Sequence, residues 1–399
     1  MHHANCQCIN CILPPHLLDK LLDSKDKDIR QAAKTTLAAT AIMRGERNVR
    51  AQLTLAMPGD SRRTIFDCEN RTSLTDAKTV MTENGKLPND DTVKRAYDGF
   101  GSTRDFYKTV LNRDSIDNNG MRLNGYVHYD DGFNNAFWDG QQMVFGDGDG
   151  IIFTDFTKSL DVIGHELTHG VTQFTAGLEY HDESGALNES ISDVFGSLVK
   201  QWTAQQTADQ ADWLIGADIL MPPRSGFAKA LRSMAKPGTA YNTPDMGKDP
   251  QPDNYKRYDH RTSDNGGVHI NSGILNKAFY EVATGIGGFA WEAPGHIWYE
   301  SLLASVPQTQ FADFANTTYL KAGQLYGSPA QRIVLEAWKT VGVAVASALV
   351  AGRDRPVNGA ATRVAREDET LAALMEQIKY LSQKVETLSK EVAVVSHGK

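Results

Sequence analysis

The sequence predicts an α+β protein in which a β-rich half is followed by a helical half. Between residues 65 and about 155 the chain is rich in glycine, asparagine, aspartate and aromatic residues, in short runs typical of strands joined by tight turns. From about 159 to 345 apolar residues recur at helical spacing, and loops rich in proline and glycine separate them. With 399 residues, 41% of them hydrophobic and 23% charged, the chain can bury a sizeable core.

The N-terminal segment is predicted to form a separate helical unit. The stretch "PPHLL" places leucines at helical spacing after two prolines, and an alanine-rich helix with mixed charges follows up to about residue 50. Proline and glycine in "AMPGDSRRT" (56–64) interrupt this pattern. We therefore expect residues 1–55 to be distinct from a first lobe over 56–175 and a second lobe over 176–350.

Charge and hydropathy exclude two classes of partner. The net charge of −8 provides no basic face for a nucleic acid. The longest apolar run, "VGVAVASALVAG" from Val341, is shorter than the roughly 18 residues of a membrane-spanning helix. The N-terminus "MHHANCQCINC" has neither the cationic start nor the long apolar stretch of a secretory signal peptide. We expect neither a nucleic-acid partner nor a membrane span.

The last part, residues 351–399, is predicted to be a linker and a coiled-coil-like tail. Its apolar residues are spaced alternately three and four apart, at Leu371, Leu374, Ile378, Leu381, Val385, Leu388, Val392 and Val395. β-Branched residues take most a positions and leucine takes most d positions, which favours pairing of two helices. The seam predicts a homo-oligomer; the alternative is one amphipathic helix packed on its own domain.

The stretch "DVIGHELTHGVTQF" (161–174) contains the strongest chemical motif. His165 and His169 are four residues apart with Glu166 directly after the first, which fits H-E-x-x-H on a helix. At about 100° per residue the two histidines lie about 40° apart on one face, so both imidazoles can reach one metal ion. Taken alone, such a pair is as often an ordinary set of core or surface residues.

A zinc site needs a third protein ligand and an open fourth position for water. The best candidate is Glu189 in "GALNESISDVFGSLVKQW", which shares a helix stripe with Asp193 beside a separate apolar face. Glu189 follows His169 by 20 positions, and a short connection between two helices would place them side by side. The alternative for such an acidic pair is a solvated helix face.

Several motifs together resemble the thermolysin family of neutral zinc metalloproteases. They are "NNAFWDGQQMVFGDGDG", "DVIGHELTHGVTQFTAGLEY", "ESGALNESISDVFG", "LRSM" and "DNGGVHINSGILNKAFY", in family order over roughly residues 62 to 345. The start of the chain resembles the short propeptide of protealysin-like members. The resemblance implies a β-rich lobe with the active-site helix, a helical lobe and a zinc cleft between them.

The resemblance also implies a role for each matching residue. His165, His169 and Glu189 would bind Zn²⁺, and Glu166 would be the general base that takes a proton from the bound water. Protein or peptide substrates would be cut by this water.

Further catalytic positions follow from the same resemblance. Tyr180 and His269 match the donors to the oxyanion of the tetrahedral intermediate. Asp264 would orient His269, while Asp193 and Asn188 would hold the ligand imidazoles in the right tautomer.

The substrate-binding positions are implied in the same way. Asn135 and Ala136 would bond the substrate backbone, and Arg232 a substrate carbonyl. Val162 and Leu231 match the walls of the pocket for the residue after the scissile bond. This match implies cleavage on the N-terminal side of a bulky hydrophobic residue, with modest discrimination among such residues.

The sequence departs from the family where thermolysin carries a double calcium site. Asp161 matches one calcium ligand, but Lys200 stands where a bridging glutamate is expected, and Leu214 and Ala217 replace further acids. A lysine cannot bind calcium, so Ca²⁺ stays open as a cofactor. Our hypothesis is that the Lys200 ammonium replaces the ion and pairs with Asp161, with Asp212 as a second candidate partner.

Three cysteines, Cys6, Cys8 and Cys11, crowd the N-terminal segment. A thiolate could bind the catalytic zinc and keep a zymogen silent, the cluster could hold its own metal with a nearby histidine, or the thiols could be free. The segment itself is expected to act as an intramolecular inhibitor that occupies the cleft until it is removed, with self-cleavage as one route.

The sequence thus predicts a zinc-dependent neutral endopeptidase made as a zymogen. One alternative is a catalytically silent binding protein on the same fold, which the intact ligand and catalytic positions disfavour. A zinc-dependent exopeptidase is the other, and nothing in the sequence resembles a device that grips a free substrate amine. Secretion without a classical signal peptide is the favoured localisation, with a cytoplasmic location left open.

Overall fold

The structure is a computed structural model that describes residues 10–53 and 62–351. Its helices are α1 (Pro15–Leu22), α2 (Lys27–Leu53), α3 (Asp91–Leu111), α4 (Leu160–Gln173), α5 (Asp182–Ala204), α6 (Asp264–Ile286), α7 (Ala293–Leu303), α8 (Phe311–Thr340) and α9 (Ala346–Ala351). Its strands are β1 (Asn10–Cys11), β2 (Arg63–Arg71), β3 (Lys78–Thr82), β4 (Leu123–Tyr129), β5 (Ala136–Trp138), β6 (Met143–Phe145), β7 (Leu214–Ile215), β8 (Phe227–Ala228), β9 (Arg232–Ser233), β10 (Tyr241–Thr243) and β11 (Gly247–Lys248). Short 3₁₀ helices lie at Phe156–Lys158 and Tyr255–Arg257.

The chain forms one compact unit up to Ser347 and a second from Ala348 onward. Of the second unit the structure describes only residues 348–351, at the end of α9. The predicted coiled-coil seam over residues 371–395 lies outside the described residues.

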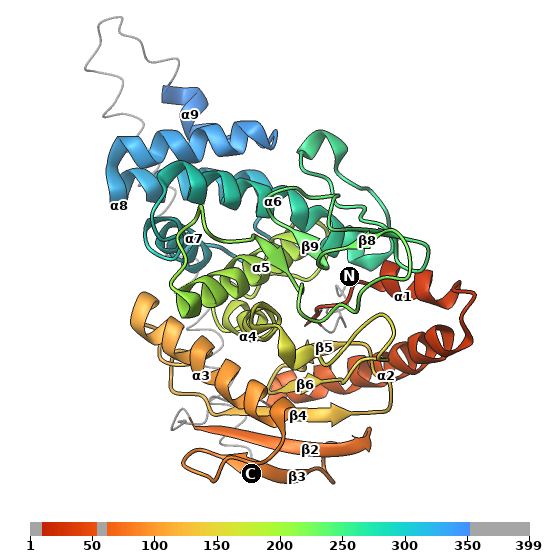
Figure 1. Cartoon of the computed structure of the whole chain (residues 1–399). Helices are drawn as coiled ribbons and strands as arrows, with labels where there is room; N and C mark the ends of the chain where they lie inside the picture. The colour runs from red at the N-terminus through yellow and green to blue at the C-terminus, as the bar shows by residue number, and fades with distance from the viewer. Residues whose placement is uncertain (1–9, 54–61, 352–399) are drawn as a thin grey trace, which may run out of the picture. The chain divides into compact units, whose positions relative to one another are not determined.

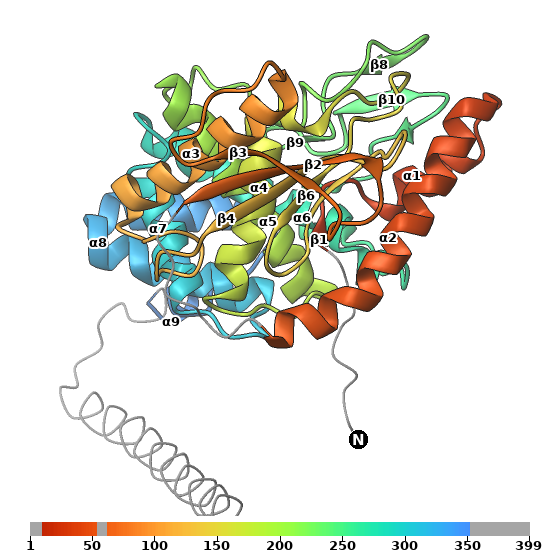
Figure 2. The ribbon, with the colours of Figure 1, turned by 90° about the horizontal axis from the view of Figure 1, so that it is seen from below.

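A mixed six-stranded sheet forms the β-rich part, in the order β1-β5-β6-β4-β2-β3. β4 runs parallel to β2 and β6, and the other neighbours are antiparallel. Buried and part-buried residues alternate along β4, so that one face of this strand lies in the core. Figures 1 and 2 show the sheet on one side of α3 and α4.

The helical part lies on the other side of α4. In Figure 1, α5 lies next to α4, and α6, α7 and α8 follow farther from the sheet. The predicted α+β architecture, with a sheet-containing N-terminal part and a helical C-terminal part, is confirmed. The sequence reading missed α3 inside the region read as strands, although Asp90 caps this helix by accepting from the backbone N–H groups of Thr92 and Val93.

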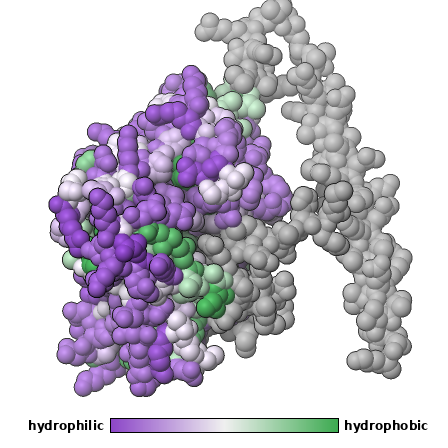
Figure 3. Space-filling model, turned by 90° about the vertical axis from the view of Figure 1, so that its right-hand side faces the viewer, coloured by the Kyte–Doolittle hydropathy of each residue, from purple (hydrophilic) through white to green (hydrophobic). Residues whose placement is uncertain are grey.

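The N-terminal segment shares a core with the sheet. α1 buries Leu17, Leu18 and Leu21, and side chains of α2 pack in one cluster with residues of the sheet and the loops beside it. That cluster contains Ala39, Met43, Cys68, Tyr129, Phe133, Phe137 and Val144. Figure 3 turns the side that carries α1 and α2 toward the viewer and shows mostly hydrophilic residues, with a hydrophobic area near the centre of the view. The predicted helices of this segment are present.

Strand β1 was not predicted. Its two residues pair antiparallel with β5, Asn10 opposite Trp138 and Cys11 opposite Phe137. A two-residue strand carries no periodicity and forms only because β5 offers an edge, so the sequence holds no local signal for it. Within residues 10–53 and 62–351, no helix is long and apolar enough to cross a membrane.

Helices α4 and α5 approach each other through two glycines. A methyl group on Gly196 would lie 2.4 Å from the Asp161 carbonyl oxygen and 2.9 Å from the His165 nitrogen, and one on Gly164 would lie 3.0 Å from the Gly196 Cα atom. These obstacles are backbone atoms, which cannot move without shifting a helix. The two glycines therefore set the distance between the helices.

We expect Gly196→Ala to destabilise the protein by about 1–3 kcal/mol, because alanine must push α4 away from α5. The matched control is Gly285→Ala in α6, where the added methyl meets only the side chain of Ile333, at 2.8 Å. Both changes raise helix propensity by about 1 kcal/mol, so Gly285→Ala should be neutral or slightly stabilising. Urea unfolding measures both free energies, and equal values for the two variants would contradict the close-contact argument.

Candidate active site

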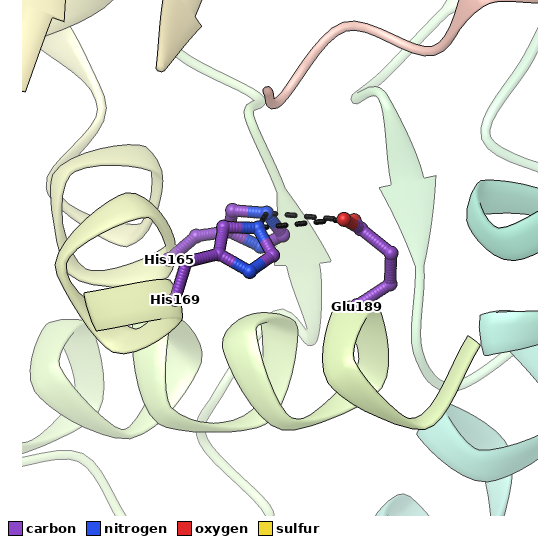
Figure 4. A group of neighbouring side chains, drawn as sticks. All are labelled: His165, His169 and Glu189. Atoms are coloured by element: carbon purple, nitrogen blue, oxygen red, sulfur yellow. Dashed lines mark hydrogen bonds and ion pairs between the residues drawn. The ribbon is translucent and has the colours of Figure 1, made fainter. Parts of the chain in front are cut away.

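The metal-ligating candidates meet between α4 and α5. α4 is buried on every face between Asp161 and Thr172, as expected of a central helix. His165 and His169 point from α4 toward Glu189 of α5 (Figure 4). Their Nε2 atoms are 3.0 Å apart, and they lie 3.5 and 3.4 Å from the Glu189 carboxylate oxygens.

Hydrogen bonds on the far side of each imidazole define its tautomer. The Nδ1 atom of His165 lies 2.8 Å from Asp193 Oδ1, and that of His169 lies 2.8 Å from Asn188 Oδ1. Both partners are acceptors, so each Nδ1 carries the proton and each Nε2 presents a lone pair. Two lone pairs that face each other beside a carboxylate repel unless a cation lies between them.

The site therefore fits a divalent metal ion. Two imidazole nitrogens and one carboxylate form the donor set of a catalytic zinc site. Among the described residues, Glu189 Oε2 is buried without a hydrogen-bond partner, whereas Oε1 accepts from the Tyr180 hydroxyl.

Glu166 lies beside the three candidate ligands. Its Oε2 atom accepts from the Trp138 backbone N–H at 3.0 Å, whereas its Oε1 atom is buried without a partner in the described part of the chain. Burial, followed by the charge of Glu189, raises the pKa of Glu166 well above its ordinary value. One carboxylate oxygen is thus fixed and the other is available to a water molecule or a substrate proton.

His269 and Asp264 form the opposite wall of the site. Four successive residues, 264–267, have positive φ angles, which asparagine and aspartate tolerate better than most residues and glycine adopts freely. This turn lets Asp264 accept from the His269 backbone N–H at 3.1 Å and contact Nδ1 of the same residue at 2.6 Å. Burial alone would lower the pKa of His269, but Asp264 and Glu189 raise it to about 9. The imidazole is therefore cationic at neutral pH.

Asp193 connects the metal ligands to the rest of the site. Its carboxylate accepts from Arg232 through Nε and Nη2, both at 2.8 Å, and from the Asn276 amide at 2.8 Å, in addition to its contact with His165. Burial would raise the pKa of Asp193, but the Arg232 guanidinium and His165 hold it well below its ordinary value.

The sequence reading assigned Arg232 to substrate alone and missed its pairing with Asp193. It also missed Asn276, although this residue follows His269 by seven positions, two turns along α6. This spacing was the signal in the sequence that could have placed Asn276 on the same face of the helix as His269.

Residues 11–13 of the N-terminal segment lie in the site. Four hydrogen bonds of the backbone hold them: His269 Nε2 to Cys11 O at 3.0 Å, Ile12 N to Ala136 O at 3.2 Å, Arg232 Nη1 to Ile12 O at 3.0 Å, and Leu13 N to Asn135 Oδ1 at 3.1 Å. The side chains of Ile12 and Leu13 are fully buried. The structure thus brings the predicted substrate-binding residues into contact with one extended segment of the chain itself.

The other predicted positions are also buried around the site. Val162 lies three residues before His165 on α4, and Leu231 directly precedes Arg232. Tyr180 places its hydroxyl 3.3 Å from His269 Nε2. Of the three N-terminal cysteines, only Cys11 lies in the described residues, and its thiol contacts the Leu13 carbonyl at 3.6 Å. Cys6 and Cys8 lie outside the described residues, so the hypotheses that involve them stay predictions.

Lys200 occupies the position where a calcium ligand was expected. Its ammonium donates to Asp161 at 2.7 Å, to Asp212 at 3.1 Å and to the Leu214 carbonyl at 2.9 Å. Burial would lower the pKa of Lys200, but the Asp161 and Asp212 carboxylates raise it above its ordinary value. The cation pairs with a carboxylate that is fully buried.

A buried His–His–Glu set with an adjacent free carboxylate and a cationic imidazole defines a metal-dependent hydrolase site. Residues 46–173 match the family described as thermolysin metallopeptidase, catalytic domain, and residues 176–343 match thermolysin metallopeptidase, alpha-helical domain. The chain belongs to the thermolysin family of metallopeptidases, as the sequence motifs predicted, and is a zinc metalloendopeptidase of that family.

Similar proteins match most of this chain over nearly their own full length. An extracellular metalloprotease of Pectobacterium carotovorum is 44% identical over 337 residues, which are 84% of this chain and 96% of that protein. Protease PrtS of Photorhabdus is 42% identical over 346 residues, 84% and 92% of the two chains. The solved precursor of protealysin from Serratia proteamaculans aligns with a TM-score of 0.77 and 47% identity over 84% of this chain and 100% of that one. The N-terminal segment is accordingly a propeptide and the protein a zymogen.

The propeptide carries one histidine into its interface with the enzyme. His16 Nε2 lies 3.2 Å from the Tyr241 hydroxyl, and its Nδ1 is buried without a partner in the described part of the chain. Burial lowers the pKa of His16 to about 4. The charged groups that act on it are Asp264, which raises the pKa, and His269, Arg261 and Arg232, which lower it. His16 is docked in its neutral form.

Acid should therefore weaken docking of the propeptide. Because the pKa of His16 is about 4 when docked and near 6.5 when exposed, docking is strongest above pH 6.5 and weakens as the pH falls from 6.5 toward 4. At pH 5 the undocked population should rise about tenfold or more. The measurement is amide hydrogen exchange of α1 at pH 7 and pH 5, with Glu166→Gln in the background to prevent self-cleavage. His16→Gln stays uncharged and should lose most of this change; the same acid response in both proteins would contradict the prediction.

Proposed function

We propose that the mature enzyme cuts peptide bonds on the N-terminal side of bulky hydrophobic residues, with Glu166 as the general base. The observation that supports this most is the segment in the cleft. Its Cys11 carbonyl lies at His269, and the residue that follows, Ile12, is apolar and fully buried. A substrate that takes the place of this segment would put an apolar side chain at the same position.

The backbone contacts of the segment also indicate how a substrate is held. Ala136 O and Asn135 Oδ1 accept from successive N–H groups, while Arg232 donates to the carbonyl between them. These contacts involve only main-chain groups of the bound segment, so they can hold a peptide of any sequence. Chain continues on both sides of the contacted carbonyl, which supports an endopeptidase over an exopeptidase.

The chemistry divides among a metal ion and three side chains. A zinc ion held by the His–His–Glu set would activate a water molecule and polarise the scissile carbonyl. Glu166 Oε1 would accept a proton from that water and pass it to the departing amine. His269 and Tyr180 would donate to the carbonyl oxygen as it gains negative charge, and Asp264 keeps His269 cationic for this purpose.

The surroundings of the protein are part of the proposal. A relative from Pectobacterium carotovorum is named an extracellular metalloprotease, and we propose that this protein too acts outside the cell on protein or peptide substrates. Pairing of two copies through residues 371–395 stays a prediction, as do the exact lobe boundaries. The next experiment tests the role proposed for Glu166.

Glu166→Gln should lower hydrolysis of a doubly blocked peptide, with leucine after the scissile bond, by at least about 10²–10⁴-fold, because an amide cannot accept the proton. The variant should still bind one equivalent of zinc, because Glu166 is not in the ligand set. Glu300→Gln on α7, a half-buried glutamate paired with Lys321 outside the site, is the matched control and should keep full activity. The measurement uses enzyme freed of its propeptide, with metal content determined in parallel. Hydrolysis by Glu166→Gln at the wild-type rate would contradict the role of Glu166 as the general base.

We further propose that the Lys200 ammonium takes the structural role of calcium. It lies between Asp161 and Asp212 and satisfies the buried carboxylate that a cation would otherwise neutralise. A positive side chain at this place would also repel Ca²⁺. Zinc should therefore be the metal that this enzyme needs.

Lys200→Met should destabilise the protein by about 3 kcal/mol, because it leaves the Asp161 carboxylate buried and unpaired. Lys339→Met removes an exposed pair with Glu336 and should cost less than about 1 kcal/mol. Thermal unfolding with and without calcium measures both effects. Wild type should unfold at the same temperature in both conditions, and a large calcium-dependent rise would refute the replacement.

A further inference from the structure

The propeptide lies in the cleft in the direction and register of a substrate. β1 pairs antiparallel with β5, and the two residues after it, Ile12 and Leu13, make the main-chain bonds described above with Ala136, Asn135 and Arg232. The carbonyl at the oxyanion donor His269 belongs to Cys11, and the next N–H, that of Ile12, points at Ala136 O. The peptide bond between Cys11 and Ile12 is therefore the one presented to the catalytic groups.

The groups needed for hydrolysis surround this bond. Glu166, whose Oε2 is fixed by the Trp138 N–H, has its other oxygen buried without a hydrogen-bond partner among the described residues, and His269 already contacts the carbonyl oxygen. The Cys11 thiol, by contrast, contacts the Leu13 carbonyl, and the group of possible metal ligands among the described residues contains no cysteine. The group of Cys11 that contacts the oxyanion donor His269 is its main-chain carbonyl.

From this arrangement we propose that Cys11–Ile12 is a self-cleavage site, cut within each molecule before the propeptide leaves. The inference rests on the proposed function. Water oxygen would bond to the Cys11 carbonyl carbon, and the bond from that carbon to the Ile12 nitrogen would break. Glu166 would carry the proton to that nitrogen. The products are a carboxylate on Cys11 and an ammonium group on Ile12, which together take up the one water consumed.

The cut releases residues 1–11 and leaves the rest of the propeptide bound. Ile12 and Leu13 stay buried, and so do Leu17, Leu18 and Leu21 of α1, which do not depend on the broken bond. The nicked enzyme is therefore still latent. Full activation needs a second event that removes the segment from residue 12 onward.

The experiment adds zinc to metal-free, full-length protein and follows intact mass and the N-terminal sequence with time. A new N-terminus at Ile12 is the expected result, at a first-order rate that is the same at two protein concentrations tenfold apart. Glu166→Gln should stay uncut for at least about 100 times longer. Cys11→Ala should be cut at the same bond, because alanine keeps the main-chain carbonyl that contacts His269.

Two further variants test the register. Ile12→Leu keeps an apolar side chain of similar volume and should be cut, whereas Ile12→Asp places a charge in a buried position and should not be cut there. Circular dichroism and zinc content verify that each variant is folded and loaded. Cleavage of Ile12→Asp at the same bond, or a rate that rises with protein concentration, would overturn the proposal.

A parallel assay separates this inference from the proposed function. Trypsin digestion of the propeptide, which has sites at Lys20, Lys25, Lys27, Arg30 and Lys34 as well as at Arg44, Arg47 and Arg50, followed by gel filtration, frees the same zinc-loaded protein of it before the blocked peptide is added. Peptide hydrolysis together with an intact Cys11–Ile12 bond before trypsin would overturn only the self-cleavage site. Failure to cut either bond would overturn the proposed function and this inference with it.

Discussion

The close contact of α4 with α5 at Gly164 and Gly196 is the constraint on which the rest of the site depends. His165 and His169 come from one helix and Glu189 from the other, so the distance between the helices sets the size of the donor set. Metal–ligand distances must be met within a few tenths of an ångström, and a single methyl group between the helices exceeds that tolerance. The absence of side chains at one crossing point therefore makes possible the chemistry of three side chains that lie within two helical turns of it.

Asp193 extends this constraint to the substrate side. Its carboxylate binds a ligand imidazole, the Arg232 guanidinium and the Asn276 amide at once, and Arg232 in turn holds the carbonyl of Ile12. A buried carboxylate with this many donors is fully satisfied, so neither the metal ligand nor the substrate clamp can shift alone. The metal centre and the substrate-binding groups are therefore one hydrogen-bonded unit.

How much of the fold and of the site the sequence predicts depends on how far apart along the chain the interacting residues lie. The H-E-x-x-H pair is local, so helix geometry alone predicts that His165 and His169 face one ion. Motif resemblance supplied Glu189, His269 and Arg232, and the structure brings them together. The pairing of Arg232 with Asp193 and the strand β1 were missed, because both depend on packing between segments that are 39 and more than 120 positions apart. The residue pattern within each of these segments does not indicate which other segment it contacts.

Latency and a substrate-like register are compatible because binding and cutting depend on different parts of the propeptide. Residues 11–13 present a peptide bond, while the buried leucines of α1 and the contacts of α2 with Phe133 and Phe137 hold the segment in place. Hydrolysis of one bond removes none of that buried apolar surface, which accounts for most of the binding free energy. The new Ile12 ammonium would also stay beside the carboxylate of Glu166. A segment held in this way can be a substrate once and an inhibitor afterwards, so release of the propeptide, rather than the first cut, would control activity.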